Sequence, residues 1–138
     1  MKYLLDTNVV SETRRKSPNL NVMAWLDRAD QSDLCLSVLT VGELIKGTAL
    51  LRRTDPAGAA SLEHWIRGLE LFFADRILSI DTDIARMWGE ISAPRPLPVI
   101  GALLAATAQV RGLTLVTRNI ADVASTNVAW LNPWEPPG

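Results

Sequence analysis

Short apolar runs alternate along this chain with longer segments whose apolar side chains recur every three to four residues. The short runs are typical of strands, and the longer segments are typical of amphipathic helices. The predicted strands span residues 2–5, 34–38, 77–80, 113–116 and 128–131, and the predicted helices span residues 20–29, 40–51, 62–73, 84–91 and 98–111. This alternation predicts an α/β domain in which helices cover a central parallel sheet.

Two of the predicted strands run directly into polar clusters. The clusters contain Asp6 and Asn8 after the first strand, and Thr117, Asn119 and Asp122 after the fourth. Open α/β sheets bind their ligands outside the carboxyl ends of the strands, so both clusters would face one pocket if the two strands are neighbours. Carboxylates that share a pocket repel one another unless a cation or protons relieve the repulsion. The sequence therefore predicts an acidic pocket suited to a metal ion.

Each candidate acid also has a purely structural interpretation. Asp6 could cap a helix that begins near Asn8. Thr40 and Glu43 fit a capping box, in which the glutamate reaches back to the first residue of its helix. Asp122 could make only a turn. If Asp6, Glu43 and Asp122 nevertheless converge, they suit Mg²⁺ or Mn²⁺, which prefer oxygen ligands and can activate water at a phosphoryl group.

The composition narrows the class of protein. A chain of 138 residues, with 48% hydrophobic and 21% charged residues, predicts one folded domain over residues 1–138. The net charge of −1 means that any contact with nucleic acid would be local or mediated by a cation. The single cysteine, the early acid at Asp6 and the lack of a long apolar run predict a cytoplasmic protein without a membrane segment.

Four segments resemble, in order, the motifs of PIN domains, and specifically those of VapC-type toxin ribonucleases from bacterial toxin–antitoxin pairs. The segments are residues 4–9, 36–44, 98–108 and 117–122, and residues 131–134 are similar too. Together they extend over essentially the whole chain, which makes the resemblance more specific than any one motif.

The resemblance implies a three-layer α/β/α fold around a parallel sheet of four to five strands. It also implies Mg²⁺- or Mn²⁺-dependent endonucleolytic cleavage of RNA, a homodimer, and neutralisation by a small antitoxin protein through which the toxin reaches DNA. Matched by position, the catalytic residues would be Asp6, Glu43 and Asp122, the metal ligands Asp6 and Asp122, and the supporting residues Asn8, Thr40, Thr117 and Asn119.

Gly101 departs from the family pattern, in which an aspartate that is usually a metal ligand stands at this position. A glycine inside a helix costs about 1 kcal/mol relative to alanine, whereas an aspartate near a helix N-terminus gains from the helix dipole. We therefore expect this chain to be a weakened or inactive nuclease.

Two alternatives remain open at this stage. One is a catalytically inert PIN-fold module that binds its antitoxin without cleaving RNA, which the glycine at position 101 favours. The other is a phosphotransfer domain, which would require paired acids at the first strand and a lysine at a later strand end, and neither is present. For an antitoxin, we expect a groove formed by the helix faces that carry Trp25, Leu50 and Leu51.

Overall fold

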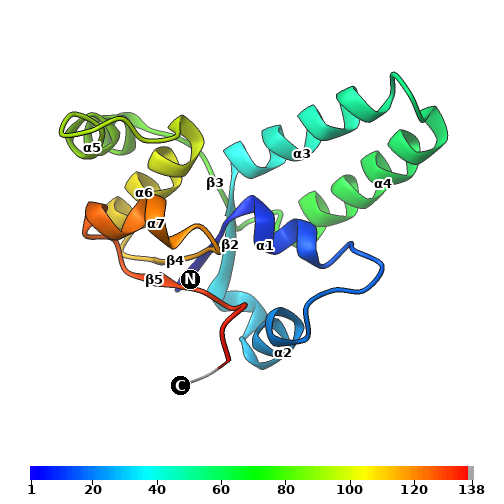
Figure 1. Cartoon of the computed structure of the whole chain (residues 1–138), viewed down its shortest axis with the longest axis horizontal. Coiled ribbons are helices and arrows are strands. Elements are labelled where there is room, and N and C mark those ends of the chain that lie inside the picture. The colour runs from blue at the N-terminus through cyan, green and yellow to red at the C-terminus, as the bar shows by residue number, and fades with distance from the viewer. Residues whose placement is uncertain (137–138) are drawn as a thin grey trace.

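A computed structural model describes residues 1–136 and shows one parallel sheet between two layers of helices (Figure 1). The strands are β1 (Tyr3–Leu5), β2 (Leu34–Ser37), β3 (Ile77–Leu78), β4 (Thr114–Val116) and β5 (Trp130–Leu131), in the order β3-β2-β1-β4-β5. All paired strands are parallel, and Leu5 lies opposite Val116 in the β1–β4 pair. The predicted α/β/α fold is therefore confirmed, and the first and fourth strands are neighbours, which is the condition for their two polar clusters to face one pocket.

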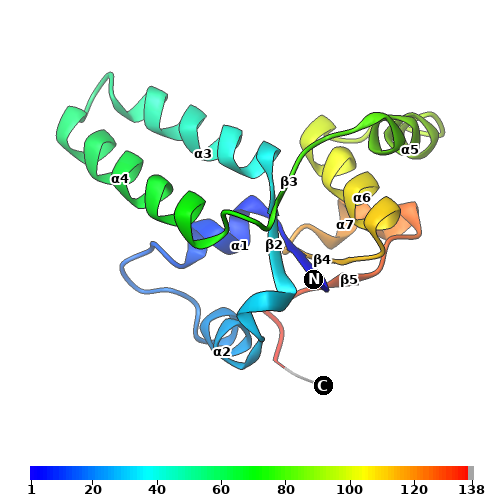
Figure 2. The same cartoon turned by 180° about the vertical axis from the view of Figure 1, so that it is seen from behind.

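Helices cover both faces of the sheet, as the two opposite views show (Figures 1 and 2). They are α1 (Thr7–Glu12), α2 (Leu20–Arg28), α3 (Val38–Leu51), α4 (Pro56–Phe72), α5 (Thr82–Ser92), α6 (Val99–Arg111) and α7 (Ile120–Val123), with short 3₁₀ turns at Gln31–Asp33 and Ala124–Thr126. Helices α1 to α4 lie to one side of the strands, and α5 to α7 lie to the other. No helix of residues 1–136 is long and apolar enough to cross a membrane.

Alternating side chains along the central strands divide the core into two clusters. Leu5 and Val116 pack with Ile66 of α4 on one face, whereas Leu4 and Leu115 pack with Leu104 of α6 on the other. Successive side chains of a strand point to opposite faces, so a single register fixes both clusters. This double burial accounts for the continuous apolar character of the short strands.

Several details differ from the sequence prediction, and one of them is that α4 begins at Pro56 rather than at residue 62. The helix expected from residue 40 begins at Val38, and the side chain of Ser37 caps it by accepting a hydrogen bond from the backbone N–H of Leu39 at 3.0 Å. The predicted capping box of Thr40 and Glu43 is therefore wrong. The segment after β4, predicted as a turn, forms the short helix α7.

Candidate active site

The carboxyl edge of the sheet borders a cavity of about 170 Å³. The polar residues that line it come from three parts of the chain and are Asp6, Glu43, Thr117, Asn119 and Asp122, and Gly101 lies beside them from a fourth part. Apolar side chains such as Leu104 and Leu115 form its floor. The structure therefore brings the three predicted acids and position 101 together at the expected edge of the sheet.

Asp6 is fixed at the junction of β1 and α1. Its backbone N–H donates to the carbonyl of Val116 at 2.9 Å, which places the residue beside the end of β4. The carboxylate accepts two hydrogen bonds, from the backbone N–H of Thr7 at 2.7 Å and from Oγ1 of Thr117 at 2.6 Å. Asp6 thus caps α1 and also reaches the pocket, so its two alternative roles coexist.

Thr117 connects Asp6 to the loop beyond β4 through hydrogen bonds. It is 1% exposed, donates to Asp6 and accepts the backbone N–H of Asn119 at 3.0 Å. Both hydrogen-bonding roles of the hydroxyl are therefore used. The arrangement ties the loop that carries Asn119 and Asp122 to the carboxylate at the end of β1.

Glu43 enters the pocket from the second turn of α3 and is held by Thr7. The Oγ1 of Thr7 donates to Oε1 of Glu43 at 2.5 Å and lies 3.3 Å from the hydroxyl of the fully buried Thr40. Such a short contact with a carboxylate is typical of charge-assisted hydrogen bonds. Sequence analysis did not identify Thr7 as a site residue, because nothing in the spacing shows that α1 and α3 meet here.

The two remaining predicted positions differ in their surroundings. Gly101 is the third residue of α6, and a Cβ atom built there would meet only the Cβ of Pro98, at 3.9 Å. The space beside it opens into the acidic pocket, so a longer side chain would fit. Asn8 does not line this cavity, and its Oδ1 atom is buried without a hydrogen-bond partner among residues 1–136.

The charged residues among the described lining of the pocket are all acidic. Burial raises the pKa of the Asp6 carboxyl above its usual value, and the charges of Glu43 and Asp122 add to that rise, although the hydrogen bonds from Thr117 and Thr7 oppose it. No lysine or arginine is among the described residues that line the cavity. The environment therefore favours a proton or a bound cation at the acids.

The acids present do not form a complete metal site. Within residues 1–136, no three His, Cys, Asp or Glu side chains lie close enough together to hold one metal ion. Carboxylate oxygens are suitable ligands for Mg²⁺ or Mn²⁺, but the described acids that line this cavity are not grouped closely enough to hold the ion, and Gly101 adds no donor beside them.

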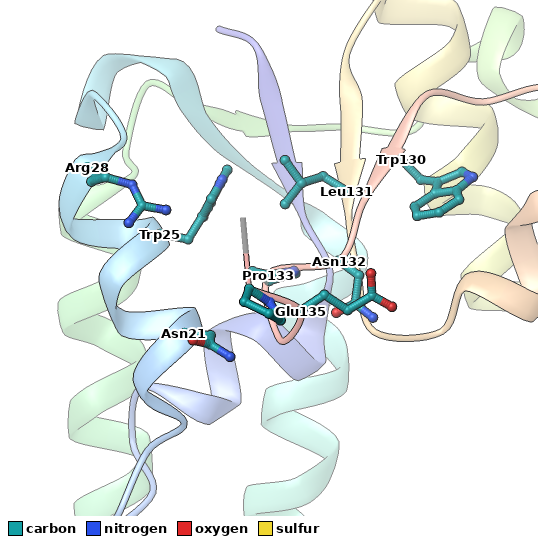
Figure 3. A pocket seen from close by; sticks show the side chains of 9 residues that line it. Asn21, Trp25, Arg28, Trp130, Leu131, Asn132, Pro133 and Glu135 are labelled. Atoms are coloured by element: carbon teal, nitrogen blue, oxygen red, sulfur yellow. The ribbon is translucent and has the colours of Figure 1, made fainter. Parts of the chain in front are cut away.

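The largest cavity described in the structure is a different one, of about 410 Å³, between α2 and the C-terminal segment. Figure 3 shows Trp25 and Arg28 of α2 on one side of it, and Leu131 and Pro133 on the other. Among residues 1–136, its lining holds one carboxylate, that of Glu135, and so lacks the grouped acids of the smaller pocket.

The predicted antitoxin groove is not formed as expected. Trp25 packs edge to face on Tyr3, with ring centroids 5.0 Å apart, and lies on α2. Leu50 is 53% exposed near the end of α3, and in both views α2 lies at the bottom of the molecule whereas that end of α3 lies at the top (Figures 1 and 2). Trp25, Leu50 and Leu51 therefore do not share one groove.

Fold and pocket together define an α/β/α domain with a carboxylate site at the carboxyl edge of a parallel sheet. The PIN-domain family matches residues 3–122. The chain is 36% identical to Toxin FitB of Neisseria gonorrhoeae, over 95% of this chain and 97% of FitB. It is 34% identical to the VapC ribonuclease Y4jK of Sinorhizobium fredii, over 96% and 98% of the two chains.

Solved structures show the same relationship. A chain in the structure of FitAB bound to an IR36 DNA fragment superposes with a TM-score of 0.90 at 33% identity, covering 99% of this chain and 98% of that one. The chain belongs to the PIN-domain family, among the VapC-type toxins that these relatives represent.

Proposed function

We propose that this chain is the toxin of a toxin–antitoxin pair and that its pocket is the active site of a Mg²⁺- or Mn²⁺-dependent endoribonuclease, weakened by Gly101. The observation that carries the proposal is the convergence of Asp6, Glu43 and Asp122 on one cavity that has no basic residue among its described lining. The relationship to a protein named as a VapC ribonuclease supports RNA as the substrate.

The roles follow from position and hydrogen bonding. Asp6 and Asp122 would be the ligands of a divalent ion, whose charge would neutralise the developing charge on a scissile phosphate. Glu43 would be the third catalytic carboxylate, held by Thr7, while Thr117 holds Asp6. Asn119 holds the loop after β4 in place by donating its backbone N–H to Thr117. The hydroxyl of Thr40 contacts that of Thr7.

Gly101 is the reason to expect weak activity. The position faces the pocket, has room for a side chain and lacks the carboxylate that the family resemblance places there. Asn8 would support the same region from α1, where its amide oxygen is without a described partner.

The direct test is RNA cleavage in Mn²⁺ by the native chain and by Gly101→Asp, purified identically and free of antitoxin. We expect cleavage by the aspartate form and little or none by the native chain. Equal cleavage by both would show that position 101 is not limiting. Cleavage by neither, with total cellular RNA as substrate, would refute the nuclease assignment.

A second candidate function is an inert module that binds its antitoxin without chemistry. The same glycine favours it, because the described acids do not complete a metal site. The two candidates separate in the experiment above, since an inert scaffold would gain no activity from one carboxylate.

We further propose that the chain forms one PIN domain over residues 1–138, acts in the cytoplasm and associates as a homodimer. Its antitoxin would cover part of the apolar surface of α3 and α4, where Ile45 is 41%, Leu50 53% and Leu71 79% exposed. DNA would be reached only through the antitoxin, as the relatedness to a FitAB complex with DNA suggests.

A further inference from the structure

A groove next to the acidic pocket carries two arginines that the proposed active site does not use. It has a volume of about 330 Å³ and lies between α1, α3 and α4. Thr7 and Glu43 line its inner end, and Glu43 also lines the acidic pocket. The outer part is lined by Arg14, Arg15 and Trp65. The groove therefore adjoins the proposed active site at Glu43.

Arg14 is held in place while most of its donors stay free. Its guanidinium lies 5.6 Å from the ring centroid of Trp65, and its Nη2 donates to Oγ of Ser61 at 3.2 Å. A guanidinium has five N–H donors in a fixed planar arrangement, so one hydrogen bond leaves the others for a phosphate. Stacking on an aromatic ring restricts the side chain before any ligand arrives.

Arg15 is anchored by a buried acid. Glu12 has a side chain that is 5% exposed, and it pairs with Nη1 of Arg15 at 3.3 Å, whereas Arg15 itself is 66% exposed. The other oxygen of Glu12 accepts the backbone N–H of Asn19 at 2.7 Å. Glu12 thus closes the segment after α1 into a loop that presents both arginines on the wall of the groove.

Charge explains what this groove would attract. The chain has a net charge of −1, and its pocket is acidic, so it has no general attraction for a polyanion. Arg14 and Arg15 place guanidinium donors beside the acids, although Glu12 already offsets part of the Arg15 charge, so Arg14 supplies most of the local positive potential. Leu44, Leu62 and Trp65 add apolar surface against which a ribose or a base can pack.

We propose that the groove binds the RNA strand that flanks the cleaved phosphate, with Arg14 and Arg15 binding its backbone phosphates. This inference rests on the proposed ribonuclease function and identifies residues that bind and position its substrate. Phosphate contacts fix the register of a strand without selecting its sequence, so the two arginines act on affinity for any RNA.

The test compares RNA binding by the native chain, by the double variant Arg14→Gln/Arg15→Gln and by the control Arg86→Gln. Arg86 is exposed on α5, on the other side of the sheet. The probe is a fluorescein-labelled pool of random single-stranded RNA about 20 nucleotides long, titrated in Ca²⁺ at several concentrations of monovalent salt. Fluorescence anisotropy gives the affinity, and thermal melting checks that each variant is folded.

Loss of two phosphate contacts should reduce the magnitude of the slope of log affinity against log salt concentration by about 1.4. At 0.1 M salt this corresponds to a roughly 25-fold loss of affinity. Arg86→Gln should leave both values unchanged. In the Gly101→Asp background, the double variant should raise KM for RNA cleavage much more than it lowers kcat.

Three results would overturn the inference. If the double variant binds RNA as Arg86→Gln does, the groove does not hold the strand, and the nuclease assignment is unaffected. If RNA binding is unchanged but co-expressed antitoxin no longer co-purifies, the groove belongs to the antitoxin. If the native chain and Gly101→Asp bind no RNA at any salt concentration and cleave none, the proposed function fails and the inference fails with it.

Discussion

Gly101→Asp should convert the acidic pocket into a divalent-ion site whose occupancy can be measured from the melting temperature of the protein. Residue 101 is the third residue of α6, its Cβ would meet only Pro98, and its side chain would enter the pocket. Replacing a helical glycine and placing an acid near a helix N-terminus each contribute a few tenths of a kcal/mol to about 1 kcal/mol. Repulsion from Asp6, Glu43 and Asp122 opposes this gain, so without divalent ions we expect a melting temperature within a few degrees of that of the native chain.

A bound divalent ion should shift this balance strongly. An ion that binds only the folded state at 100 times its Kd adds about 2.7 kcal/mol to the free energy of unfolding. Unfolding entropies of about 2.1 cal/mol/K per residue give roughly 0.29 kcal/mol/K for 138 residues. The melting temperature of Gly101→Asp should therefore rise by about 9 °C at saturating MgCl₂.

Differential scanning calorimetry of the native chain, Gly101→Asp and Gly68→Asp, with EDTA and with millimolar MgCl₂, measures this shift in melting temperature. Gly68→Asp is the matched control, because Gly68 lies on exposed helix α4 with nothing near its Cβ position. We expect a magnesium-dependent rise for Gly101→Asp only. An equal rise for the native chain would show that Gly101 leaves the site intact, and no rise for Gly101→Asp would show that a carboxylate at 101 is not a ligand.

Three further predictions follow from single contacts. Thr7→Val should destabilise the fold by about 1.5–3 kcal/mol in urea titrations, because it removes the hydroxyl that donates to Glu43. In the Gly101→Asp background it should also reduce RNA cleavage. Thr7→Ser keeps the hydroxyl and should retain both the stability and the cleavage activity. Asp6→Asn should have a higher free energy of unfolding than the native chain at pH 7. The pKa of Asp6 is raised in the folded protein, so the stability of the native chain falls as the pH rises from 3.8 through the folded pKa. The advantage of the variant should therefore vanish below pH 3.8. Gly112→Ala should lower stability by roughly 1–2 kcal/mol in thermal melts, because residue 112 ends α6 at a φ of 67°.

The features that sequence analysis predicted well are those with a strong local signal. The short apolar runs of β1 and β4 and the helical stripe of α4 follow from side-chain pattern alone, and Gly112 ends α6 where a left-handed residue is needed. The edge at which the acids meet follows from strand direction, which is fixed once the sheet is known to be parallel.

The features that it missed depend on contacts between distant elements. Ser37 outcompetes Thr40 as the cap of α3, because β2 ends at Ser37 and the helix starts without a loop. Thr7 becomes the partner of Glu43 only because α1 crosses the start of α3. The expected groove of Trp25 and Leu50 failed for the same reason, since equal hydrophobicity does not show which faces of two helices meet.

The acidic pocket has an electrostatic cost that the fold itself does not offset. Burial raises the pKa of Asp6, two further acids add to the rise, and the hydrogen bonds from Thr7 and Thr117 only reduce it. No basic side chain among the described lining residues neutralises the three carboxylates. Structural carboxylates in folded domains are usually paired with cations, so this arrangement is better explained by a ligand that supplies positive charge. Arg14 and Arg15 lie on the wall of the groove that shares Glu43 with this pocket. We therefore expect cations at the acids and arginines along the groove to act on one phosphodiester strand, each neutralising a different phosphate.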